Sequence, residues 1–237
     1  MSNSSPDLSR RDFFKVSAAA IATVGVANFL KPSYATEVNV KTVALSNLPK
    51  DPVEVAKSSE LVQKAWDYLL GEINSLHDLA LREKVFSFYQ NTVPTFMEQH
   101  HGSANVSKVY KMLLQEHLVD PALTDEAHLF PPLKDLNINP QPFFSAPGSG
   151  YGSHHAYPGG LATHTAVNVE ITKSILTTYS HIMDYEYGYD MAVAGQLLHD
   201  LAKPWVFQWN KDGSCLKEYS IAGTGAHHIF SIAEAIY

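Results

Sequence analysis

Residues His154–Thr165 read HHAYPGGLATHT and place three histidines around a Pro-Gly-Gly turn. Surface histidines are usually scattered, and core positions prefer apolar side chains, so this grouping indicates a functional site. Proline and glycine punctuate regular structure, and a helix is therefore expected to begin after the turn. This helix would carry His164 close to its beginning.

Further side chains of types that can bind metal ions lie downstream, in LLHDLAK, Leu197–Lys203. Consecutive side chains of a helix point about 100° apart, so His199 and Asp200 can share an ion only if it lies between their directions. His164 would supply the third ligand from another helix. Three protein ligands leave coordination positions open for water and substrate, as catalytic metals require.

The composition limits what such a centre can contain. The chain has 237 residues, 45% hydrophobic and 17% charged, which is typical of a folded globular protein. Its single cysteine, Cys215, excludes an internal disulfide and a multi-cysteine zinc site. Imidazole and carboxylate would bind a divalent transition metal, either Mn, Fe, Ni, Co or Zn, as one or two ions.

The first 35 residues have the pattern of an export signal. SRRDFFK, Ser9–Lys15, precedes a mildly apolar run, Val16–Leu30, and small residues follow. This pattern predicts a twin-arginine signal peptide cleaved after Ala35, although an N-terminal amphipathic helix remains the alternative. The apolar run is too short for a stable membrane span. We expect a periplasmic or otherwise exported protein, with the twin-arginine export machinery as a partner.

Removal of residues 1–35 makes the chain more acidic. The full chain has 17 basic and 24 acidic side chains; the signal contains four and two of these, which leaves 13 and 22, or a net charge of −9. Nucleic-acid binders normally present a basic face, so a nucleic-acid partner is not expected.

Apolar periodicity predicts helices over most of the chain, and hence an all-α fold. Residues 36–150 would form a helical N-terminal region ending in a proline-rich linker, and residues 151–237 a metal-binding domain. The first helix is expected to begin at about Ser58. The others are expected over Leu76–Thr92, Asn105–Val119, 160–179, Tyr187–Ala202 and, approximately, Gly225–Tyr237. A β-hairpin is expected from Trp205, with its turn at Asn210–Gly213. In the helix 160–179 the apolar face would consist of Leu161, Val167, Ile171, Ile175 and Leu176.

His164, the His199-Asp200 pair and the HDLAK context resemble the HD superfamily of metal-dependent phosphohydrolases. HHAYPGGLATHT is similar to the HD domain of bacterial 3′–5′ exoribonucleases that combine an OB-fold with an HD domain. The resemblance covers roughly residues 150–237. It implies an HD-domain helical bundle with a small β-hairpin, here preceded by a helical N-terminal region.

The resemblance also implies roles for individual residues. His164, His199 and Asp200 would bind the metal, and His228 would bind a second ion. Lys203 would neutralise a substrate phosphate, and His155 would contact substrate or water; these two are the candidate catalytic residues. The substrate would be a small phosphorylated compound.

Two features depart from the family pattern. The family has a further aspartate ligand downstream, but no aspartate follows Asp212, and the chain ends within a predicted helix, as a fragment would. No OB-fold is visible in residues 36–150. A nuclease is therefore the least favoured enzyme class.

Other histidines and aromatic residues have simpler interpretations. The segment LHDLALRE, Leu76–Glu83, repeats the His-Asp doublet. Unlike the other doublet, it is not preceded by a Pro-Gly-Gly turn with a histidine shortly after the turn. The pair His100-His101 is expected at the surface. Three aromatic residues of the expected hairpin would pack in the interior, or in part wall a substrate pocket: Trp205, Phe207 and Trp209.

Three functions remain open from the sequence. The leading one is hydrolysis of a phosphate ester or phosphoanhydride by a metal-activated water, which needs no serine or cysteine nucleophile and agrees with the absence of a GxSxG motif. The second is an HD-fold di-iron oxygenase. The third is a non-catalytic exported module that binds a ligand through a degenerate site.

Overall fold

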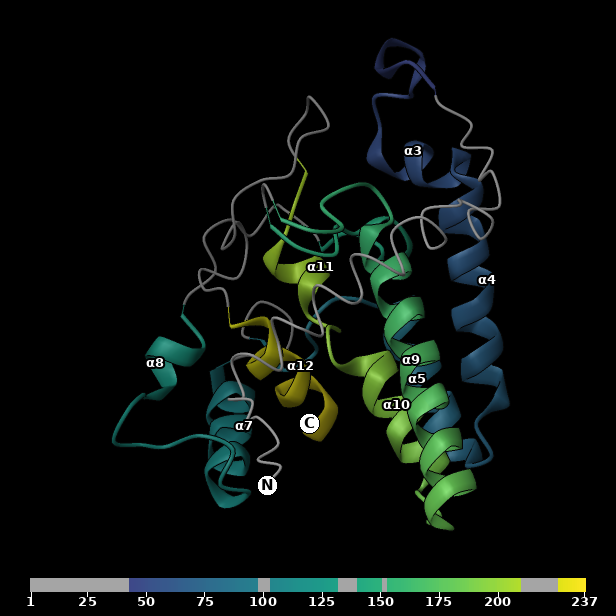
Figure 1. Ribbon diagram of the computed structural model, residues 1–237. Coiled ribbons are helices and arrows are strands. Elements are labelled where there is room, and N and C mark those ends of the chain that lie inside the picture. The colour runs from purple at the N-terminus through teal and green to yellow at the C-terminus, as the bar shows by residue number, and fades with distance from the viewer. Residues whose placement is uncertain (1–42, 98–102, 132–139, 151–152, 210–225) are drawn as a thin grey trace, which may run out of the picture. The chain divides into compact units, whose positions relative to one another are not determined.

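The computed structural model describes residues 43–97, 103–131, 140–150, 153–209 and 226–237 (Figure 1). The chain divides into two compact units, Met1–Asn47 and Leu48–Tyr237. The predicted boundary near residue 150 falls inside the second unit. The predicted signal peptide and the pair His100-His101 lie outside the described residues.

The described residues are predominantly helical, which confirms the all-α prediction. The elements are η2 (Leu45–Asn47), α3 (Pro52–Ser58), α4 (Glu60–Ser75), α5 (Leu79–Gln90), α7 (Ser103–Gln115), α8 (Glu126–Leu129), η3 (Phe143–Ser145), α9 (Gly160–Met183), α10 (Tyr189–Leu198), α11 (Lys203–Val206) and α12 (His227–Ile236).

Side-chain caps define where several helices begin. The carboxylate of Asp51 accepts from the Val53 N–H before α3, and the hydroxyl of Ser59 accepts from the Val62 N–H before α4. Each cap satisfies a backbone donor that the first helical turn leaves without a partner.

The long helix α9 lies at the centre of the first hydrophobic core. It packs against α4, α10 and η3, while α5 packs against α4 and α10 (Figure 1). An ion pair between Lys173 on α9 and Glu72 on α4, 2.6 Å apart, joins the two longest helices. The core contains Leu69, Ile73, Leu76, Val85, Tyr89, Phe143, Ala146, Leu161, Ala162, Val169, Val193, Ala194 and Leu197.

A second hydrophobic core forms where α12 packs against α7 and α11. Its buried residues are Phe96, Met97, Val106, Val109, Leu113, Leu129, Phe130, Ala202, Trp205, Val206, Phe207, Phe230 and Ala233. The chain passes from the first core to the second within eight residues, since Leu197 belongs to one and Trp205 to the other. The His199-Asp200 pair is therefore held at the junction of the two cores, where packing from both sides restricts its movement.

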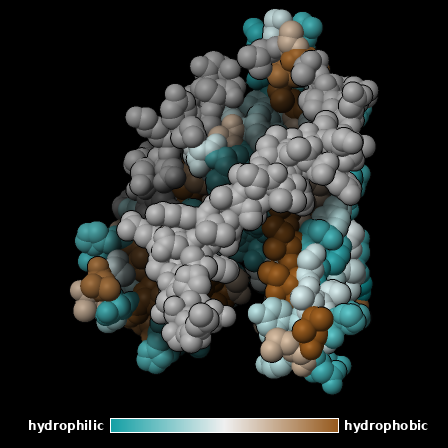
Figure 2. All heavy atoms as spheres, in the orientation of Figure 1, coloured by the Kyte–Doolittle hydropathy of each residue, from teal (hydrophilic) through white to brown (hydrophobic). Residues whose placement is uncertain are grey.

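The predicted apolar face of α9 is wrong in most of its members. Val167, Ile171 and Ile175 are about half exposed, at 53%, 52% and 51%. Figure 2 shows the band of apolar surface along this helix. The buried residues of α9 are Leu161, as predicted, Val169, and the smaller Gly160, Ala162, Thr163 and Thr165; small side chains allow α4 and α10 to approach closely.

The chain after α10 also differs from the prediction. We expected the helix to continue to Ala202, but α10 ends at Leu198 and a separate helix, α11, begins at Lys203. Pro204 stands in the first turn of α11, where a missing N–H costs no hydrogen bond. The predicted hairpin strand is thus helical at Trp205 and Val206, and residues 210–225 of the hairpin lie outside the described part.

No helix in the described ranges has both the length and the apolar character needed to cross a membrane.

Candidate metal centre

A tight loop positions the two histidines that precede α9. Gly159 adopts a left-handed conformation with φ 83°, and His155 is also left-handed with φ 58°. The Gly148 N–H donates to the His155 carbonyl over 3.0 Å. This close packing places the rings of His155 and His154 5.2 and 5.4 Å from the ring of His164.

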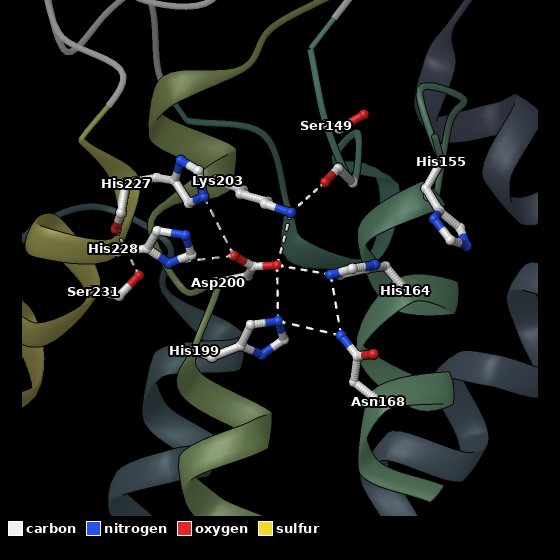
Figure 3. Close-up of polar contacts among 12 residues, drawn as sticks. Ser149, His155, His164, Asn168, His199, Asp200, Lys203, His227, His228 and Ser231 are labelled. Carbon is white, nitrogen blue, oxygen red and sulfur yellow. Dashed lines mark hydrogen bonds and ion pairs between the residues drawn. The ribbon is translucent and has the colours of Figure 1, made fainter. Parts of the chain in front are cut away.

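Three predicted ligand atoms meet at the junction of the two cores (Figure 3). The Oδ2 atom of Asp200 lies 3.0 Å from Nε2 of His164 and 2.9 Å from Nε2 of His199. The Asp200 side chain is buried, whereas both histidines are partly exposed. The centre therefore has a buried anionic end and a side that solvent reaches.

The tautomer of His199 follows from its backbone contact. Its Nδ1 lies 2.6 Å from the carbonyl oxygen of Gln196. A carbonyl can only accept, so Nδ1 carries the proton and Nε2 of a neutral ring has a free lone pair. Metal-binding histidines typically donate their second ring nitrogen to such an acceptor.

The arrangement fits a divalent cation. Neither carboxylate oxygen of Asp200 has a partner in hydrogen-bond geometry, although both are buried. Metal–nitrogen bonds of about 2.1 Å at right angles separate neighbouring ligand atoms by about 3.0 Å, which is the spacing around Oδ2. His164, His199 and Asp200 are one of three groups in the described residues that could hold a metal ion.

Electrostatic contacts keep Asp200 ionised. Burial alone would raise its pKa, but His164 and His199, together with Lys203, outweigh burial and hold the pKa of Asp200 well below its ordinary value. Burial likewise works against protonated His199, yet the neighbouring carboxylate raises the pKa of His199 overall. The carboxylate therefore offers a full negative charge at neutral pH.

Lys203 points inward, toward the carboxylate. Its Nζ lies 2.7 Å from Oδ2 of Asp200 and donates to the carbonyl oxygen of Gly148. The residue is only 5% exposed. The ammonium group therefore links Asp200 to the loop before α9.

Two histidines at the start of α12 approach the other carboxylate oxygen. Oδ1 of Asp200 lies 3.5 Å from Nε2 of His227 and 4.0 Å from Nδ1 of His228. These three residues form a second possible metal-binding group, and His154, His155 and His164 form a third. His228, the predicted ligand, is 67% exposed, whereas His227, which was not predicted, is nearer to Oδ1 and only 18% exposed.

Asn168 is a further residue of the site, and it was not among the predicted ligands. It stands one helical turn after His164, and its Nδ2 lies 3.1 Å from Nε2 of His164 and 3.4 Å from Nε2 of His199. The only sequence signal is the i,i+4 spacing, which places the two side chains on one face of α9.

The other His-Asp doublet has a structural role. The Asp78 carboxylate caps α5 by accepting from the Ala80 and Leu81 N–H groups, and His77 contacts Asp190 over 2.9 Å. The aromatic residues Trp205 and Phe207 are buried in the second core, as expected for packing.

Part of the chain is similar in sequence to a characterised enzyme. The chain is 34% identical over 61 residues to dihydroneopterin 2′,3′-cyclic phosphate phosphodiesterase from Methanocaldococcus jannaschii. The match covers 26% of this chain and 24% of that enzyme, so the chain aligns with about a quarter of the relative's length. No protein-family profile and no solved structure matches the chain. This local similarity is consistent with a phosphohydrolase.

Proposed function

We propose that this protein is a metal-dependent phosphohydrolase of the HD type, which cleaves a phosphate ester or phosphoanhydride of a small molecule with a metal-activated water. The observation that carries the proposal is the convergence of His164 Nε2 and His199 Nε2 on the buried Oδ2 of Asp200. The partial similarity to a cyclic phosphate phosphodiesterase supports the same reaction class.

His164, His199 and Asp200 would hold the cation. When bound, a divalent cation would supply Lewis acidity, which polarises a phosphoryl oxygen and lowers the pKa of water. The Gln196 carbonyl orients the His199 ring, and Lys203 keeps the Asp200 carboxylate fixed and ionised. The partly exposed ring faces leave access for substrate from solvent.

His155 is suited to contact the substrate. Its ring is partly exposed beside His164, and burial together with the nearby His164 lowers its pKa. A neutral imidazole there can donate one hydrogen bond and accept another, so it can bind a phosphate oxygen or a water molecule.

Chelation of the purified protein should abolish hydrolysis of bis(p-nitrophenyl) phosphate or p-nitrophenyl phosphate. Addition of one of the five candidate metals, Mn, Fe, Ni, Co or Zn, should restore it, because the activation of water depends on the ion. Elemental analysis would follow metal content, and circular dichroism would verify that the chelated protein remains folded. Hydrolysis that persists in chelator, or that no metal supports, would contradict the proposal.

The second carboxylate oxygen favours one alternative. Oδ1 of Asp200 faces His227 and His228, and Oδ2 faces His164 and His199. Two ions, one in each group of side chains, would therefore share the Asp200 carboxylate. A di-iron oxygenase would use such a pair. Two iron ions per chain with substrate-dependent oxygen uptake would support the oxygenase, whereas turnover without oxygen would exclude it.

We also propose that the chain is exported through the twin-arginine pathway and cleaved after Ala35. The support is the sequence pattern of Arg10 and Arg11 before an apolar run. Replacing both arginines with lysine should retain the uncleaved precursor in the cytoplasm of a bacterial host, as cell fractionation would show. Lys31→Gln, outside the motif, is the control; export of the double-lysine variant would exclude this pathway.

A further inference from the structure

Asn168 takes a fourth place around the proposed metal position. Its amide end faces the same two Nε2 atoms that approach Asp200, at 3.1 Å from His164 and 3.4 Å from His199. In Figure 3 the amide of Asn168, the two imidazoles and the carboxylate of Asp200 lie at the four corners of one polar cluster. The two distances from Oδ2 of Asp200 to the Nε2 atoms are 2.9 and 3.0 Å, and the two from Nδ2 of Asn168 to the same atoms are 3.1 and 3.4 Å.

These separations match those between neighbouring ligands of one ion. Metal–ligand bonds of about 2.1 Å give separations of about 3.0 Å at 90° and about 3.4 Å at the tetrahedral angle. The amide of Asn168 is therefore separated from both Nε2 atoms by the distance expected between two ligands of the same ion.

The orientation of the amide shows what a cation would change. Its NH₂ group now faces Nε2 of both histidines, where it can donate to their lone pairs. A metal bound by those lone pairs would remove both acceptors and bring positive charge to the NH₂ group. Rotation of the amide by 180° exchanges NH₂ and Oδ1 without moving the backbone, and it presents an oxygen ligand to the cation.

We propose that Asn168 is a fourth protein ligand of the metal centre, bound through Oδ1. The inference rests on the metal centre of the proposed function, but it does not depend on which reaction the centre performs. It makes the site at Oδ2 a two-histidine, one-carboxylate, one-amide centre, which combines imidazole with harder oxygen ligands.

The test is the affinity for Co²⁺ alone, measured by competition with a chromophoric chelator, together with the visible absorption of bound Co²⁺. Asn168→Ala should weaken binding by at least about tenfold and change the absorption bands, because the ion loses a ligand. Asn168→Asp should bind at least as tightly as the wild type with wild-type-like bands, because it keeps the oxygen and cannot offer NH₂.

Val167→Asp is the matched control for charge. It adds the same carboxylate one residue earlier on α9, on the exposed face, and should change Co²⁺ affinity by less than about threefold because solvent screens it. Alanine has a high helix propensity, so Asn168→Ala should remain folded.

The outcomes separate the ligand from the reaction. Unchanged Co²⁺ affinity and bands in Asn168→Ala would overturn the inference, as would an Asn168→Asp variant that binds as weakly as the alanine variant. A wild-type protein that binds no Co²⁺ would overturn the inference together with the metal centre. The expected Co²⁺ series in a protein that hydrolyses no phosphate would support the inference and exclude only the hydrolase.

Discussion

Asp200→Asn is expected to lower phosphoesterase turnover by at least about a thousandfold and to remove bound metal. The Asp200 carboxylate is the anionic ligand around which His164 and His199 converge, and a neutral amide cannot replace its charge. A metal ion contributes several kcal/mol to transition-state stabilisation, and each 1.36 kcal/mol is about tenfold in rate. Steady-state kinetics and elemental analysis on the same samples would test the prediction.

Asp78→Asn provides a control with an identical local sequence. Residues 76–80 and 198–202 both read LHDLA, but the first doublet caps α5. Asparagine caps a helix about as well as aspartate, so Asp78→Asn should keep both stability and turnover within about twofold. A comparable loss of turnover in both variants would contradict the assignment of the site.

A second variant guards against a folding defect. Asp200→Asn leaves the buried ammonium of Lys203 without its carboxylate, which is a recognised cause of destabilisation. His199→Ala removes one metal ligand while the pair of Asp200 and Lys203 stays intact. It should therefore lose metal and turnover while its unfolding midpoint changes less than that of Asp200→Asn. Full metal content in folded His199→Ala would exclude this centre.

The two LHDLA segments also show what local sequence can and cannot decide. Both doublets have the residue types of a metal site, and the Pro-Gly-Gly turn before His164 helped to distinguish them. That turn predicted the start of α9 correctly, because glycine and proline act through local backbone conformation. The position of Asp200 between two hydrophobic cores depends on long-range packing, which periodicity does not contain.

Errors in the prediction share the same physical origin. The +4 spacing of Val167, Ile171 and Ile175 describes an apolar face correctly, but not which face the fold buries. Similarly, Pro204 marks a helix boundary, and whether it ends one helix or begins the next depends on the chain around it. Asn168 could not be selected from the sequence, because its proximity to His199 arises only when α9 packs against α10.

Gly160→Ala is expected to destabilise the protein by more than about 3 kcal/mol, because the loop before α9 leaves no room for a side chain. A Cβ at Gly160 would lie 1.8 Å from the carbonyl oxygen of His155, a backbone atom held by the Gly148 N–H. The loop would have to move, and His154 and His155 with it.

Gly71→Ala on α4 is the matched control. Its Cβ would meet nothing within 4 Å, so the substitution should stabilise the protein by about 0.5–1 kcal/mol through the lower entropy of the unfolded chain. Urea unfolding of both variants would measure the difference, and equal stability of Gly160→Ala and the wild type would mean that the loop does not pack against the start of α9 as described.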